Sequence, residues 1–257
     1  MGNYNHTWRH YAADKLVNGF ISCCGPMSIT VPPGCIAIDT HIHSLYSRCS
    51  VTSVRRIILR AAQIGLGGIA VLDHNDLRSA KDAAKCAEEL KRNGLIPAGF
   101  TVISGMEISS NAGHIGALFV NEVIPMKLGL RETVEQIHMA GGLAIAVHPF
   151  LRSGIGDALF DAPFDAVEIE SGSAFGRIPV EKSQSLLNDE RMIGMAKLGS
   201  SDAHYARAIG MCFTVIKSCE ITPDLIRSHI SGCLTSPQPS STSLRIRKML
   251  GNMTIHK

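Results

Sequence analysis

The sequence predicts an α/β protein in which parallel strands alternate with helices and close into a barrel. Short apolar runs rich in Ile, Val and Ala recur along the chain, and amphipathic segments separate several of them. Such alternation is typical of a parallel sheet with crossover helices. About seven or eight of these units fit into roughly 220 residues, which favours a barrel over an open sheet. Metal-capable side chains also follow the apolar runs, at the edge where parallel barrels build their sites.

The predicted strands are short apolar runs that contain many β-branched or small side chains. They cover residues 36–39, 68–73, 102–108, 115–120, 143–148, 166–170, 195–202 and 211–217. The predicted helices have apolar residues at helical spacing, and Gly65 and Gly94 are stop signals for two of them. They cover residues 53–65, 77–94, 131–142, 180–190 and 223–230. Thr222 is expected to cap the last helix, because Pro223 suits the first helical position.

The composition is that of a globular domain, with 45% apolar and 18% charged residues in a chain of 257. A net charge of +3 is too small to indicate a nucleic-acid or membrane surface as partner. The eight cysteines form no C-x-x-C pair, and a chain of this length needs no disulfide framework. We therefore expect reduced thiols in a cytoplasmic protein, and the composition leaves the oligomeric state open.

The chain is predicted to have three parts: an N-terminal extension packed on the domain (1–35), a central α/β domain (36–235) and a basic C-terminal tail or helix (236–257). No charged residue occurs between Lys15 and Asp39, but glycines and prolines interrupt this run. A membrane-spanning helix needs about 20 mostly apolar residues, and a signal peptide lacks an acidic leader. No membrane segment is therefore expected.

Metal-capable side chains gather at the ends of the predicted strands. Asp39, His41 and His43 occupy alternate positions, and alternate residues of a strand point to one face. The others follow later strands and are Asp73, His74, Glu107, His114, His148, Asp202 and His204. Each by itself is more often a cap or loop residue, but burying all of them without a cation is costly. Nitrogen and oxygen donors suit Mn, Zn or Fe, and their number exceeds the need of one tetrahedral metal, so two or three divalent ions are predicted.

Five stretches resemble the polymerase and histidinol phosphatase (PHP) superfamily: DTHIHSLYS, GIAVLDHND, SGMEISSNAGHIGALF, AIAVHPF and LGSSDAH. They occur in the family's order between residues 36 and about 217. The resemblance implies a distorted seven-stranded (β/α) barrel of the PHP type. It also implies a two- or three-metal site at the C-terminal edge and a metal-dependent hydrolase that acts on phosphoesters.

The resemblance also implies a role for each site residue. His41 and His43 are similar to the first ligand pair, and Glu107 is similar to the carboxylate that bridges two metals. The other implied ligands are His114 and His148 for the second metal, Asp202 shared with the first, and His74 and His204 for the third. Asp39 and Asp73 are expected to support the site by orienting neighbouring imidazoles.

One position departs from the family pattern. The family has an Asp or His five or six residues after the second histidine of its first motif, where this chain has Arg48 and Cys49. An arginine cannot coordinate a metal, whereas Cys49 is either a thiolate ligand or a small buried side chain. We therefore expect the third metal to be weakly bound, partly occupied or absent.

The expected reaction is hydrolysis of a small phosphomonoester such as a nucleotide. Two cations about 3.5–4 Å apart can hold a bridging hydroxide that attacks phosphorus. The predicted catalytic residues are Glu107 and Asp202, which hold the metals, and His204, which can protonate the leaving oxygen. The candidate phosphate clamps, whose guanidinium groups match phosphate oxygens, are Arg48, Arg177 and Arg207.

Three alternatives stay open. One is an exonuclease-type phosphodiesterase on short oligonucleotides, although the lack of a basic, aromatic-lined stretch argues against stable nucleic-acid binding. Another is an amidohydrolase-type enzyme, although no lysine ends the predicted fourth or fifth strand. The third is a non-catalytic binding module stabilised by metal, which would bind metal without turnover.

Overall fold

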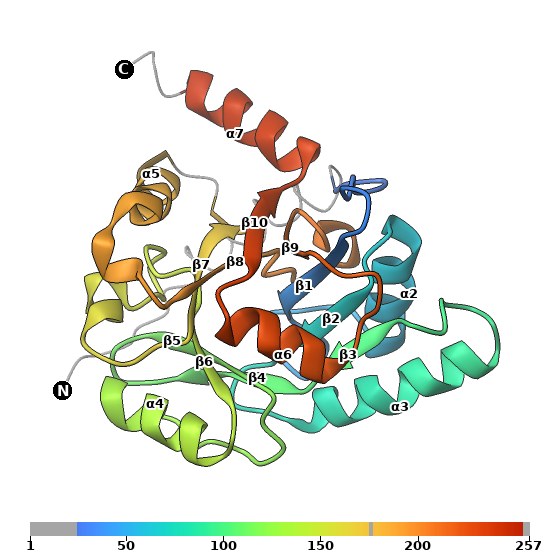
Figure 1. Cartoon of the computed structure of the whole chain (residues 1–257), viewed down its shortest axis with the longest axis horizontal. Helices are drawn as coiled ribbons and strands as arrows, with labels where there is room; N and C mark the ends of the chain where they lie inside the picture. The colour runs from blue at the N-terminus through green and yellow to red at the C-terminus, as the bar shows by residue number, and fades with distance from the viewer. Residues whose placement is uncertain (1–24, 175–176, 254–257) are drawn as a thin grey trace.

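The computed structural model describes residues 25–174 and 177–253, whose strands form two five-stranded sheets. The strands are β1 (Ile36–Ile42), β2 (Gly68–Val71), β3 (Thr101–Ile103), β4 (Gly105–Ser109), β5 (His114–Leu118), β6 (Leu143–Ala146), β7 (Ala166–Ser171), β8 (Ala196–Ser200), β9 (Cys212–Ile216) and β10 (Thr235–Pro239). The α-helices are α2 (Val54–Ile64), α3 (Arg78–Arg92), α4 (Leu130–Met139), α5 (Arg177–Ser185), α6 (Pro223–Ser231) and α7 (Ser241–Met253). The sheet orders are β10-β9-β1-β2-β3 and β4-β5-β6-β7-β8. Helices α2 and α3 lie beside the first sheet and α4 beside the second (Figure 1).

The predicted helix ends follow from local capping. Ser53 caps α2 by accepting a hydrogen bond from the backbone N–H of Arg56, and Gly65 ends the helix with φ 97°. Thr222 caps α6, whose first residue is Pro223. These ends agree with the sequence because a cap depends on a few neighbouring residues.

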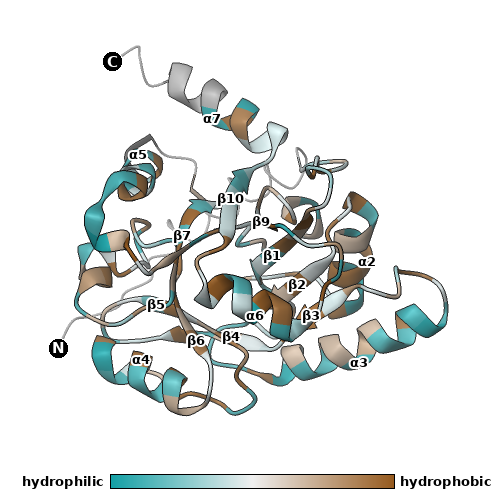
Figure 2. Ribbon diagram, viewed as in Figure 1, coloured by the Kyte–Doolittle hydropathy of each residue, from teal (hydrophilic) through white to brown (hydrophobic). Residues whose placement is uncertain are grey.

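Three groups of buried apolar residues hold the layers together. One joins the first sheet to α2 and α3, and another joins the second sheet to α4. The third combines side chains from both sheets, among them Ile38 of β1 and Leu198 of β8. Figure 2 shows hydrophobic colour in the strands and hydrophilic colour on the outer parts of α3 and α4. The two sheets are therefore packed against each other, with α2, α3 and α4 on their outer sides and α6 contributing Ile226 and Ile230 to the shared cluster.

The predicted seven-stranded barrel is not confirmed, because the described residues form two sheets without a closed barrel. The predicted strand 102–108 is divided: β3 pairs in parallel with β2, whereas β4 pairs antiparallel with β5. A parallel neighbour needs a crossover of about a dozen residues, but only residues 110–113 connect β4 to β5. Strand β9 is likewise antiparallel to β1. The fold is thus a mixed α/β arrangement.

The predicted extension and tail are described in part. Residues 25–35 include Ile29, which donates its backbone N–H to the carbonyl of Ile64 and packs on the core beside α2. Residues 1–24 lie outside the described residues. The predicted boundary at residue 235 falls at the start of β10, which pairs with β9. In the described part of the chain, none of the helices has the length and apolar character for a membrane crossing.

Two isolated parallel bridges connect the sheets near the ends of their strands. Ile42 pairs with Ala203, and His74 pairs with Glu107. These contacts bring the ends of β1 and β2 next to β4 and to the segment after β8. The polar residues that follow these strands are therefore brought to one place.

Candidate metal centre

Six histidines from both sheets lie together and are termed the histidine cluster: His41, His43, His74, His114, His148 and His204. Five of their rings form a closed circuit in which neighbouring ring centroids lie between 4.6 and 5.7 Å apart. The ring of His204 joins the circuit at His43, with a centroid distance of 4.5 Å. The predicted histidine ligands are thus all brought together.

Glu107 lies inside the histidine cluster and is fully buried. Its Oε2 lies 2.7 Å from Nδ1 of His74, and its Oε1 lies 3.0 Å from Nδ1 of His114 and 3.1 Å from Nε2 of His148. The β4–β5 hairpin positions two of these groups, because Glu107 is on β4 and His114 begins β5. Gly113, with φ 143°, makes a turn that other residues rarely adopt.

His41 and His43 come from the end of β1 and meet Asp202. Their Nε2 atoms are 3.1 Å apart, and Asp202 Oδ1 lies 3.6 Å from the first and 3.1 Å from the second. Nδ1 of His41 donates to Oε1 of Glu168 at 2.9 Å, because a carboxylate can only accept. Nε2 of His41 is therefore the nitrogen available to a cation.

The backbone is strained at two of the predicted ligands. His148 and Asp202 have φ values of 29° and 48°, which are uncommon for residues other than glycine. The backbone N–H of His148 donates to Oε2 of Glu168 at 2.8 Å, and Ser173 Oγ donates to the Asp202 carboxylate. Strain of this kind persists where surrounding contacts enforce it, as at functional sites.

Several buried polar atoms of the cluster have no hydrogen-bond partner, namely His74 Nδ1, His114 Nδ1, His148 Nδ1 and Glu107 Oε2. Two of these nitrogens approach Glu107 within 3.0 Å but without hydrogen-bond geometry. Leaving such an atom unsatisfied costs roughly 1–3 kcal/mol. A cation would accept these lone pairs, and imidazole nitrogens with carboxylate oxygens suit transition metals. The residues present therefore fit a metal centre.

Among the described residues, four sets of side chains have ligand atoms within 4.8 Å of one another. The sets are His41–His43–Glu107, His74–Glu107–His114, His41–His148–Asp202 and His43–Cys49–His74–His204. Every predicted metal ligand occurs in at least one set. Glu107 belongs to two sets, so it lies where a bridging carboxylate is expected.

One residue that the sequence did not place in the site, Glu168, contacts its histidines, and Cys49, left open by the sequence as a thiolate ligand or a small buried side chain, lies among them. Cys49 joins His43, His74 and His204 in the last set. Glu168 holds His41 and also accepts from Ser200 Oγ at 2.5 Å. The signal for Glu168 is its place in the otherwise apolar run AVEIE, where a buried acid needs partners.

Asp39 and Asp73 accept hydrogen bonds from backbone N–H groups and from a hydroxyl group. Asp39 accepts from the backbone N–H groups of Ser201 at 2.9 Å and Gly210 at 3.1 Å. Asp73 accepts from the backbone N–H of Ser44 at 2.8 Å and from its hydroxyl at 2.5 Å. Orientation of neighbouring imidazoles by these two acids stays a prediction.

The three arginines predicted to bind phosphate lie in different parts of the structure. Arg48 is exposed. Arg207 lines a cavity of about 760 Å³ with Arg56 and Arg60, and no residue of the histidine cluster lines it. Arg177 begins α5, and its side chain lies outside the described part of the structure. Phosphate binding by these arginines stays a prediction.

The two carboxylates of the cluster are held in the ionised form. Burial raises the pKa of Glu107, but the imidazoles of His114 and His74 outweigh this and lower the pKa well below its usual value. Burial also raises the pKa of Asp202, but His41 lowers it well below its usual value. Both side chains therefore carry negative charge at neutral pH.

When no cation is bound, some imidazoles carry protons that balance the negative charge of Glu107 and Asp202. Burial lowers the pKa of His74, but the charge of Glu107 outweighs it and raises the pKa to about 11. Burial also lowers the pKa of His204, but the hydrogen bond with Cys49 and the charge of Asp202 raise it to about 9. Without metal, both imidazoles are therefore protonated at pH 7.

Metal binding should release at least two protons per chain at pH 7, one each from His74 and His204, and the pKa of His41, raised well above its usual value, adds to this count. A cation binds only the neutral imidazole, and a raised pKa keeps the competing proton bound up to higher pH. The apparent metal affinity should therefore rise with pH between pH 6 and 8. Calorimetric titration in buffers of different ionisation enthalpy measures the proton count. A binding enthalpy that does not depend on the buffer would contradict this prediction.

Glu168→Gln should weaken metal binding about 10- to 100-fold. Glu168 accepts at both oxygens, from His41 and Ser200 at one and from the His148 backbone at the other. An amide would turn its own N–H₂ group toward one of these donors. Competition with a chromophoric chelator measures the affinity, and Glu132→Gln on the exposed side of α4 is the control. Equal affinities of the two variants would show that Glu168 does not orient His41 for a metal.

Comparison with family models matches the PHP domain over residues 39–190 and a PHP-associated model over residues 191–232. An uncharacterized protein of Methanocaldococcus jannaschii is 36% identical over 143 residues, which cover 51% of this chain and 79% of that protein. The first model matches a range that contains five histidines of the cluster. The range matched by the second model contains the sixth, His204.

Two crystal structures have a similar fold at low sequence identity. A two-domain protein containing a predicted PHP-like metal-dependent phosphoesterase, from Bacteroides vulgatus, has a TM-score of 0.65 at 19% identity, over 86% of this chain and 73% of that one. A lesion-specific endonuclease from Pyrococcus furiosus has a TM-score of 0.54 at 18% identity, over 77% of this chain and 56% of that one. At these identities the likeness concerns the fold alone.

Proposed function

The chain belongs to the PHP domain family, and from this premise we propose that it is a metal-dependent hydrolase that cleaves a small phosphomonoester such as a nucleotide. The observation that carries the proposal is the meeting of six imidazoles with the buried Glu107 and Asp202. The proposed cofactors are two or three divalent ions of Mn, Zn or Fe, held by the sets described above.

When bound, divalent cations of this kind activate water and neutralise the charge of a phosphoester. Glu107 and Asp202 supply the negative charge that such cations require. His204 donates Nδ1–H to the carbonyl of Asp202 at 2.9 Å, since a carbonyl only accepts. Its Nε2 is left either to bind a cation or, when protonated, to give a proton to the leaving oxygen.

The centre is accessible from one side. The side chains of Glu107 and His41 are fully buried, whereas those of His74, His114 and His204 are 28%, 23% and 16% exposed. A substrate therefore reaches the centre past these three histidines. A terminal phosphate is small enough to enter while the rest of a monoester stays outside, which favours a phosphomonoester.

An aromatic ring near this side favours a substrate with a flat group. Residues 44–52 form a loop in which Ser47 Oγ accepts from the backbone N–H of His74 at 2.9 Å. The same loop carries Tyr46, which is 37% exposed, whose hydroxyl hydrogen-bonds to Asp82, and over one face of whose ring the Arg78 guanidinium carbon lies 5.3 Å from the centroid. Stacking of a nucleobase on such a ring contributes roughly 1–3 kcal/mol. This observation favours a nucleotide over a sugar phosphate.

The proposal is tested by phosphate release from a substrate panel. The full-length protein is loaded with Mn, Zn or Fe and offered nucleoside monophosphates, bisphosphates, sugar phosphates and short oligonucleotides. Nucleoside monophosphates should be cleaved, and Tyr46→Ala should raise KM for them about tenfold with little change for sugar phosphates. Leu45→Ala is the control, because Leu45 is an exposed neighbour without an aromatic ring.

Each other outcome selects one alternative. Cleavage of oligonucleotides alone would indicate a phosphodiesterase, the kind of activity that the name of the Pyrococcus furiosus protein gives. Cleavage of amides or lactones instead of phosphoesters would indicate amidohydrolase chemistry. Metal binding without any turnover would indicate a binding module.

A further inference from the structure

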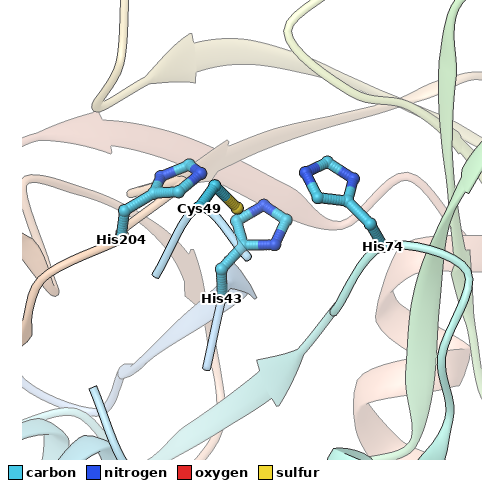
Figure 3. Close-up of side chains that lie close together, drawn as sticks. All are labelled: His43, Cys49, His74 and His204. Carbon is cyan, nitrogen blue, oxygen red and sulfur yellow. The ribbon is translucent and has the colours of Figure 1, made fainter. Parts of the chain in front are cut away.

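The thiol of Cys49 distinguishes one part of the metal centre from the rest. The Cys49 set consists of His43, Cys49, His74 and His204. Figure 3 shows these four side chains close together, coming from the end of β1, the loop after it, the segment after β2 and the segment after β8. The Cys49 set contains no carboxylate, whereas each of the other three sets contains Glu107 or Asp202.

The loop that carries the thiol is tied to the segments that carry the imidazoles. The backbone N–H of His74 donates to Ser47 Oγ at 2.9 Å. Ser50 Oγ lies 2.9 Å from the carbonyl oxygens of both His43 and His204. The residues on both sides of the thiol are therefore held in place, which positions the sulfur before any ligand binds.

One imidazole of the set is already oriented through one of its ring nitrogens. Nδ1 of His204 donates to the carbonyl of Asp202, which leaves Nε2 with a lone pair. Histidines that bind metal commonly have their other nitrogen held in this way.

We propose that Cys49, His74 and His204, with His43 shared, bind Zn²⁺ through a thiolate and select Zn²⁺ over Mn²⁺. A thiolate is a soft ligand that favours zinc, whereas sets of carboxylates and imidazoles also accept Mn or Fe. The complete centre is therefore mixed, with zinc at the Cys49 set. This proposal rests on the metal centre of the proposed function, and its readouts need no turnover.

Titration of the metal-free full-length protein with Co²⁺ tests the thiolate. A thiolate bound to Co²⁺ gives a near-ultraviolet charge-transfer band, which one equivalent of Zn²⁺ should remove and an excess of Mn²⁺ should not. Cys49→Ser should lack the band and should weaken zinc binding at this site on the order of 100-fold. Cys86→Ser, which removes a partly buried thiol on α3, should leave both unchanged.

A band of equal intensity in Cys49→Ser, or its removal by Mn²⁺ as readily as by Zn²⁺, would overturn the proposal. If this variant does not fold, the native protein still decides. Zinc should slow the alkylation of Cys49 by iodoacetamide roughly tenfold or more, whereas manganese should not. Equal rates with and without zinc would overturn the proposal as well.

The test also separates this proposal from the proposed function. A charge-transfer band in a protein that cleaves no phosphoester would refute the hydrolase and leave the zinc site standing. Phosphoester cleavage by a protein without the band would refute the zinc site and leave the hydrolase standing.

Discussion

Glu107→Gln should remove more than one metal ion per chain and lower kcat by several orders of magnitude. Glu107 belongs to two of the sets that can hold a metal, and its oxygens approach His74, His114 and His148 within 3.1 Å. A glutamine lacks the charge that compensates two cations, and its N–H₂ group would face an imidazole nitrogen. Elemental analysis after gel filtration, together with phosphoester turnover, measures both effects.

Glu132→Gln makes the same chemical change on the exposed side of α4 and should leave metal content and kcat unchanged. Loss of a single metal equivalent in Glu107→Gln would show that this carboxylate serves one cation and bridges none. Unchanged metal content would remove the basis for a multinuclear centre.

His41→Ala and Asp202→Asn should each lower kcat by several orders of magnitude while the fold remains intact. His41 belongs to two of the metal-capable sets, and Asp202 shares one of them. In His41→Ala, Glu168 still accepts from Ser200 Oγ and from the His148 backbone, so this buried acid keeps partners. Asparagine suits position 202 because it tolerates positive φ better than alanine does.

Turnover rates, circular dichroism and thermal unfolding of the two variants measure these effects. A chelator should abolish turnover of the native protein, and added Mn²⁺ or Zn²⁺ should restore it. Full activity after exhaustive chelation would exclude metal dependence. Loss of the circular dichroism spectrum in both variants would show that these residues maintain the fold, so their kinetics would then carry no mechanistic meaning.

The positions of the site residues relative to the strands followed from local pattern. Apolar runs predicted the strands that carry or precede these residues: His41 and Glu107 lie within β1 and β4, and His74 and Asp202 follow β2 and β8. The predicted cap at Thr222 also agreed, because a cap's hydrogen bonds span a few residues. The resemblance to the PHP superfamily was confirmed by the match over residues 39–190.

The arrangement of the strands did not follow from local pattern. The run 102–108 has continuous strand character, but its two halves pair with different partners, β2 and β5. Which edge a strand joins depends on segments far away in the chain, although the short connection between β4 and β5 already requires an antiparallel pair. The parallel barrel was therefore expected where two mixed sheets occur.

By itself, the sequence determined which chemical groups are available: six histidines, Glu107 and Asp202 near the ends of apolar strands, and no acid or histidine where Arg48 and Cys49 stand. Only the tertiary structure decided how these groups face each other. It turned Asp39 toward backbone amides and made Glu168 the partner of His41. It also brought Cys49 beside histidines from other segments. The reason is physical, since the direction of a side chain depends on register shifts and on contacts between distant segments, which a local pattern does not contain.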